Sequence, residues 1–157
     1  MTFRISGLSP QPFQHLFGLS DEQLSAHIAL RYRADGTREL TDRIEMRNAK
    51  PGETVLLVNH ECQAANTPYR ATHAIFVLEG ASAPWVGQPG EVPEIMQIYL
   101  QSLRGFSEKG MLIEADVAFG EDVSPTIERL FQNPQVSYIH AHNAKQGCYA
   151  GRIDRLP

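Results

Sequence analysis

The chain has 157 residues, a net charge of −4 at pH 7 and two cysteines. Its length suits one domain over residues 1–157, and its shares of hydrophobic and charged residues, 42% and 20%, exclude a disordered or fibrous protein. The acidic balance, with basic residues scattered along the chain, argues against a nucleic-acid partner, because phosphate binding needs a basic surface.

The first fifty residues predict two short helices and a strand. Ser9-Pro10 combines a capping residue with a proline at a helix start, and Ser20 to Gln23 has the pattern of a capping box. Residues 28–33, IALRYR, alternate between apolar and basic side chains and indicate a strand. The opening segment lacks the apolar stretch of a signal peptide, so we expect a soluble, cytoplasmic protein without a membrane partner.

The middle of the chain predicts two strands and a long loop. Residues 54–58 and 74–78 read TVLLV and AIFVL, which are buried-strand patterns. Residues 80–93 are rich in Gly, Pro and small side chains and predict a loop that contains Trp85, the only tryptophan. Loops of this length inside a compact domain are often functional.

The last third predicts two hairpins and two short helices. The hairpins join residues 103–106 to 111–117 and residues 136–142 to 148–153, and the helices start at Pro93 and at Ser124-Pro125. Hairpin or loop connections dominate, which argues against a doubly wound parallel sheet. We therefore expect an α+β fold with a mainly antiparallel, twisted sheet and a few small helices, and closure of the sheet into a barrel is left open.

The final hairpin has the strongest chemical pattern. His140 and His142 lie two residues apart, so on a strand they point to the same face and together suit a divalent metal or acid–base catalysis. A third metal ligand would come from His60, Glu61 or His73. Cys148 follows a short loop and is a candidate nucleophile beside His142. The alternative is that the histidines are hydrogen-bonded polar residues and the cysteine a small buried one, with no cofactor required.

Other polar residues suggest a site for an anion. Arginine offers a planar fork of donors that matches a carboxylate or phosphate. The candidate ligand-binding residues are Tyr69, Arg70, Arg104, Asn143 and Arg152. Each arginine taken alone is better explained as a surface charge, so the prediction requires that two of them converge with His140 or His142.

Three long stretches carry a family resemblance. They read FRISGLSPQPFQHLFGLSDEQL, PGETVLLVNHECQAANTPYRATHAIFV and VSYIHAHNAKQGCYAGRIDR. Together, from Phe3 to Arg155, they resemble the bacterial domain-of-unknown-function family 1203. The resemblance implies a small stand-alone bacterial protein, and it implies no reaction, cofactor or catalytic residue.

Two functional hypotheses follow. The first is a small-molecule binding protein or enzyme with a pocket for an anionic ligand, lined by the histidines and arginines. The second is a non-catalytic, homo-oligomeric interaction module that uses Trp85 and an exposed sheet edge. Convergence of the candidate residues would favour the first hypothesis.

Overall fold

The protein is described here by a computed structural model, which covers residues 2–157. Its contacts divide these residues into two compact units. Unit 1 comprises residues 2–6, 61–73 and 86–157, and unit 2 comprises residues 7–60 and 74–85. The 61–73 segment, which ends one strand and begins the next, therefore belongs to unit 1.

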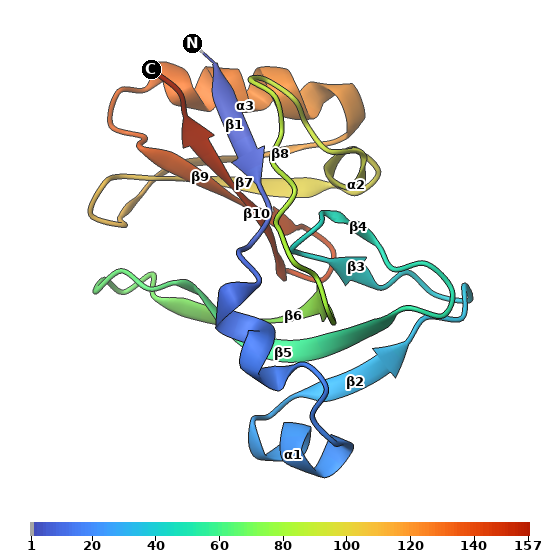
Figure 1. Cartoon of the computed structure of the whole chain (residues 1–157). Helices are drawn as coiled ribbons and strands as arrows, with labels where there is room; N and C mark the ends of the chain where they lie inside the picture. Colours follow the sequence, from blue (N-terminus) through green and yellow to red (C-terminus); the bar gives the residue numbers. More distant parts are fainter. Residues whose placement is uncertain (1) are drawn as a thin grey trace. The chain divides into compact units, whose positions relative to one another are not determined.

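Unit 1 contains a five-stranded antiparallel sheet in the order β1-β10-β9-β7-β8 (Figure 1). Two hairpins, β7–β8 and β9–β10, supply four of its five strands, as the sequence predicts, and the amino-terminal strand pairs with β10. The strands are β1 Phe3–Ser6, β7 Gln101–Phe106, β8 Leu112–Ala118, β9 Tyr138–Asn143 and β10 Tyr149–Arg155.

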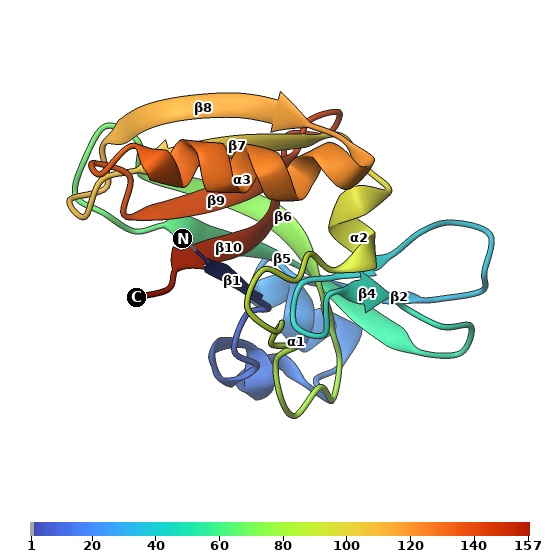
Figure 2. The same ribbon diagram turned by 90° about the horizontal axis from the view of Figure 1, so that it is seen from above.

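A single amphipathic helix covers one face of this sheet. Helix α3, Val123–Gln132, lies along β7, β8 and β9 in Figure 2. Its buried residues Ile127 and Leu130 are spaced by three, so they share one side of the helix and pack toward the sheet. Two shorter helical segments, α2 Glu94–Gln97 and η2 Gly120–Asp122, precede it. The 61–73 segment of unit 1 lies on the opposite face of the sheet.

Unit 2 is built around strands in the order β2-β5-β6-β3-β4. Strand β2 pairs antiparallel with β5, whereas the short β3 pairs parallel with β6. The elements are η1 Gln11–Leu16, α1 Asp21–Ala26, β2 Leu30–Arg33, β3 Thr41–Asp42, β4 Arg47–Asn48, β5 Thr54–Gln63 and β6 Ala71–Leu78. Strands β5 and β6 each continue into the 61–73 segment.

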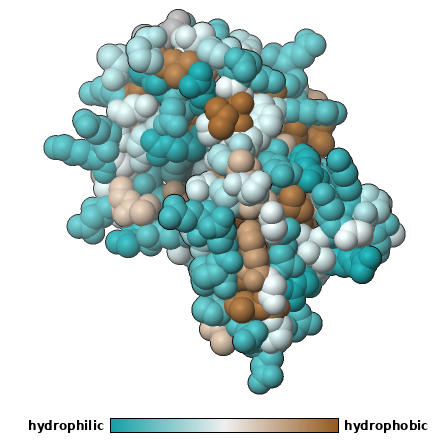
Figure 3. Space-filling model, viewed as in Figure 1, coloured by the Kyte–Doolittle hydropathy of each residue, from teal (hydrophilic) through white to brown (hydrophobic). Residues whose placement is uncertain are grey.

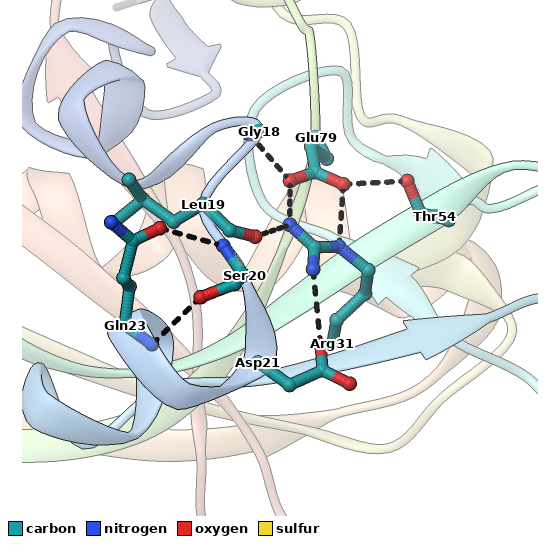
Figure 4. Close-up of polar contacts among 8 residues, drawn as sticks. All are labelled: Gly18, Leu19, Ser20, Asp21, Gln23, Arg31, Thr54 and Glu79. Atoms are coloured by element: carbon teal, nitrogen blue, oxygen red, sulfur yellow. Dashed lines mark hydrogen bonds and ion pairs between the residues drawn. The ribbon is translucent and has the colours of Figure 1, made fainter.

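A polar network fastens helix α1 to the strands of unit 2 (Figure 4). Arg31 of β2 donates two hydrogen bonds to Glu79, at 2.9 and 2.6 Å, and a further one to the carbonyl of Leu19. Glu79 also accepts from the Thr54 hydroxyl and the Gly18 amide. The hydrogen bonds from Arg31 are the main reason why the pKa of Glu79 is lowered to about 2. Every charged group at the centre of the network thus has a partner.

Most of the predicted architecture is confirmed. The fold is α+β with two mostly antiparallel sheets, and neither sheet of the described residues closes into a barrel. The capping box at Ser20 and Gln23 is present with both of its hydrogen bonds. Helix α3 begins at Val123, ahead of the predicted cap at Ser124, and the segment after Ser9 forms a 3-10 helix. The loop over residues 80–93 contains only one isolated bridge, at Val86.

Hydrophobic surface is limited on the side seen in Figure 3, where hydrophobic residues gather in small patches between hydrophilic ones. Among residues 2–157, no helix combines the length and the apolar character needed to cross a membrane. The most exposed large hydrophobic residue is Ile28, whose φ of 55° is unusual for a β-branched side chain.

Candidate metal centre

Three potential metal ligands converge in unit 1. One ligand atom from each of Cys62, His73 and His142 lies within 4.8 Å of the other two. His142 is buried, whereas Cys62 and His73 are half-buried. Zinc bonds of about 2.0–2.3 Å hold tetrahedral ligands roughly 3.3–3.6 Å apart, so side-chain shifts of about an ångström would bring the three atoms to coordination distance.

The cluster lies on the sheet face opposite helix α3. Side chains alternate along a strand, so Tyr138, His140 and His142 of β9 share one face, and Arg104 of β7 joins them because it pairs with His140. We call this surface the histidine face. Cys62 and His73 reach it from the two ends of the 61–73 segment, and the His73 and His142 rings are 4.8 Å apart.

The 61–73 segment is fixed to the histidine face by hydrogen bonds. Gln63 donates to the hydroxyl of Tyr138 at 2.9 Å, and the Thr67 hydroxyl donates to the carbonyl of Gly110 at 3.1 Å. The 61–73 segment comes closest to the β7–β8 turn at Gly110, where an added Cβ would lie 2.3 Å from the Cβ of Ala65. Only glycine fits there, and its φ of 81° also favours glycine.

The hydrogen bonding of His142 leaves one ring nitrogen ready for a metal. Its Nδ1 lies 2.9 Å from the carbonyl oxygen of Gly147. A carbonyl only accepts, so Nδ1 carries the hydrogen and Nε2 holds the free lone pair. Metal-binding histidines almost always have such a partner on the second nitrogen. Burial, the largest influence, lowers the pKa of His142 to about 4, so the ring is neutral near pH 7.

The other two ligands are also affected by burial. Burial lowers the pKa of His73, with a smaller contribution from Arg104, so this ring too favours the neutral form that binds metals. Burial raises the pKa of the Cys62 thiol, which lies 3.6 Å from the carbonyl oxygen of Ala71. A metal would displace the thiol proton, because the thiolate is the ligand.

Arg104 brings a positive charge to the cluster. It is half-buried in β7. Its charge adds to burial in lowering the pKa of His73 and His142, whereas at Cys62 it opposes the rise in pKa that burial causes. Among residues 2–157, no carboxylate forms an ion pair with it. Of the predicted anion-binding arginines, it is the one that the structure brings to the metal cluster.

His140 is placed differently from its predicted partner His142. It is 3% exposed, and its ring lies 5.2–5.4 Å from those of Phe106, Tyr138 and Tyr149. Within the described residues, the group of potential metal ligands contains His142 without His140. The structure thus brings one of the two predicted metal ligands together with His73, one of the three proposed third ligands. Cys62 is a ligand that the sequence reasoning did not single out.

Cys148 and Asn143 lie beside the cluster in the final hairpin. The Asn143 amide donates to Cys148 Sγ at 3.7 Å, and Gln101 donates to the Asn143 oxygen at 3.2 Å. His142 bonds to the carbonyl of Gly147. A nucleophilic role for Cys148 and a ligand role for Asn143 stay predictions.

The remaining predicted ligand-binding residues have partners of their own. Arg70 forms an ion pair with Glu61 at 2.9 Å, and Arg152 forms one with Asp154 at 2.8 Å and stacks over the ring of Tyr138. Tyr69 is 40% exposed and packs edge-on against Phe106. All of these residues belong to unit 1, but the two arginines already have their charges paired.

Two residues named by the hypotheses belong to unit 2. His60, one of the proposed third ligands, packs its ring against that of Phe13 at 5.6 Å. Trp85 is half-buried, and its backbone bonds to Gly7 and Ile44. The oligomeric role proposed for Trp85 stays a prediction.

The fold and the cluster define an α+β protein with a candidate metal centre. The chain belongs to the family described as "Protein of unknown function (DUF1203)", whose model matches residues 41–155. The family resemblance is therefore confirmed. No curated protein and no solved structure matches the chain.

Proposed function

We propose that this protein is a metalloprotein that binds a divalent transition-metal ion, zinc in the first place, and presents it to a small-molecule ligand. The observation that carries the proposal is the convergence of Cys62, His73 and His142, one potential ligand atom from each lying within 4.8 Å of the others. Thiolate and imidazole are the ligands that zinc prefers in proteins.

The number of ligands favours a functional zinc over a structural one. Structural zinc sites are closed by four protein ligands, whereas catalytic sites use three and leave the fourth position to water or substrate. Cys62 and His73 are half-buried, so the cluster has a side that solvent reaches. A zinc ion there would polarise a bound group or lower the pKa of a bound water.

Calorimetric titration of untagged, metal-free protein with zinc tests the proposal. We expect one ion per chain. Cys62→Ser and His142→Ala should each weaken zinc binding by about 100-fold. Zinc-finger peptides bind zinc with about 10–16 kcal/mol through four ligands, which gives roughly 3 kcal/mol for each ligand. About one proton should be released per ion at pH 7, from the Cys62 thiol.

A matched pair of residues provides the control. Cys148→Ser makes the same chemical change in a half-buried cysteine outside the ligand group and should leave zinc affinity unchanged. Equal losses in the two serine variants, or stoichiometric binding that survives both Cys62→Ser and His142→Ala, would contradict the assignment. Failure of the wild-type protein to bind zinc would leave the homo-oligomeric interaction module as the hypothesis to pursue.

Copper is the competing metal for this ligand set. Two histidines and a cysteine also hold copper in blue-copper sites, and copper(II) outcompetes zinc at most sites regardless of function. Affinity therefore does not separate the two metals. The two metals are distinguished by the metal content of protein that is expressed with equal supplies of zinc and copper, and we expect zinc. An intensely coloured protein that contains copper would mean that copper takes the place of zinc in the proposal.

A further inference from the structure

We propose that Arg104 and the open position of the metal centre together bind a small molecule through a carboxylate or phosphate group. This inference rests on the proposed function, because the metal supplies one of the two attachment points. Arg104 is a positioning residue here: its guanidinium would hold the anionic group that the metal coordinates.

The charge pairing distinguishes Arg104 from Arg70 and Arg152, the other two arginines predicted to bind an anion. Within the described residues, ion pairs with carboxylates occupy Arg31, Arg47, Arg70, Arg129 and Arg152. Arg104 has no such pair, although it is half-buried on the histidine face. A partly desolvated cation without a counter-charge is unfavourable, and an anionic ligand would remove that cost.

Arg104 lies on the same face of the sheet as the metal ligand His142. Arg104 pairs with His140 across β7 and β9, and the next residue on the same face of β7, Ser102, pairs with His142. Guanidinium binds carboxylate and phosphate oxygens through two parallel hydrogen bonds, and zinc accepts an oxygen of the same groups.

Cobalt-substituted protein provides the test, because the visible spectrum of cobalt(II) responds to a change in its ligands. Inorganic phosphate and acetate are titrated separately into the cobalt protein. We expect a saturable spectral change with at least one of them, and the tighter of the two identifies the chemical group. Arg104→Gln should weaken the binding of that anion by at least about tenfold, because this is the usual loss of affinity when a hydrogen bond to a charged group is removed.

Arg70→Gln is the matched control, because it removes the same charge from unit 1 at a residue that Glu61 already pairs. It should leave the affinity for the anion unchanged, and both variants should bind cobalt as the wild-type protein does. Equal weakening by the two variants would overturn the role of Arg104. Cobalt binding without a response to either anion would overturn this inference alone, whereas failure to bind cobalt would remove the proposed metal centre and the inference with it.

Discussion

Each unit of the protein contains a half-buried arginine in a polar cluster, and the two clusters differ in how completely they are paired. In unit 2, Arg31 bonds to Glu79, Asp21 and the carbonyl of Leu19. In unit 1, Arg104 lies beside a thiol and two imidazoles, and no carboxylate among residues 2–157 pairs with it.

The difference separates a cluster that maintains the fold from one that suits a ligand. The Arg31 network is complete, so holding α1 against the strands explains every bond in it. The cluster of Cys62, His73 and His142 with Arg104 has three metal-type ligands and an arginine with no carboxylate partner, more than packing requires. We therefore expect the unit 2 network to be needed for stability and the unit 1 cluster for binding.

Glu79→Gln should have the largest effect on stability. The substitution removes the charge that Arg31 and the surrounding donors are arranged around, and breaking such a half-buried pair costs about 3 kcal/mol. Urea unfolding at pH 7 measures the loss. Asp21→Asn, which alters the exposed partner of Arg31, should change stability by less than about 1 kcal/mol; a comparable loss in both variants would mean that Glu79 is not the centre of the network.

The pH dependence of stability should show a contribution from His142 in the metal-free protein. Its pKa falls from 6.5 in the unfolded chain to about 4 in the folded one. The contribution of His142 to the free energy of unfolding is complete above pH 6.5 and is lost as pH falls toward 4. The whole loss is about 3 kcal/mol, at about 1.4 kcal/mol per pKa unit. Unfolding measured across this range should be less pH-dependent in His142→Gln. Identical pH profiles would contradict the buried, neutral imidazole.

Gly110→Ala should disturb unit 1 by about 2 kcal/mol, because the added Cβ meets Ala65 and the φ of 81° is strained for alanine. The 61–73 segment carries two of the metal ligands, so zinc affinity should fall together with stability. Gly90→Ala is the control, since its φ of 79° is similarly strained but nothing lies within 4 Å of the added Cβ. Unchanged zinc affinity in Gly110→Ala would show that the close approach does not position the ligands.

Arg104→Gln should have the smallest effect on folding, within about 0.5 kcal/mol, because no carboxylate of the described residues loses a partner. Thermal unfolding of the metal-free protein measures it. The free energy of unfolding should fall much less in Arg104→Gln than in Glu79→Gln. A loss of several kcal/mol in Arg104→Gln would instead give Arg104 a structural role like that of Arg31.

The strands and hairpins of this fold could largely be predicted from local patterns. Alternation and turn residues identified both hairpins of unit 1, and capping residues identified α1. The short strands β1, β3 and β4 were not predicted, because two to four residues carry too little periodicity and their pairing comes from distant strands. The division into two units is likewise set by long-range contacts.

The candidate site could be predicted only in part. The spacing of His140 and His142 predicted that both lie on one face of β9, but their different neighbours depend on the 61–73 segment and the aromatic rings packed there. Cys62 and His73 are eleven positions apart in the sequence, and only the paths of β5 and β6 bring them together. The only hint in the sequence was that Cys62 and His73 lie in one polar segment and are both of a metal-binding type.

The most direct test of the metal centre is a crystal structure of the untagged protein grown with zinc, with anomalous data collected across the zinc edge. We expect a peak bound by Cys62 Sγ, a nitrogen of His73 and Nε2 of His142. Absence of a peak there under these conditions, or a peak held by other residues, would contradict the metal centre.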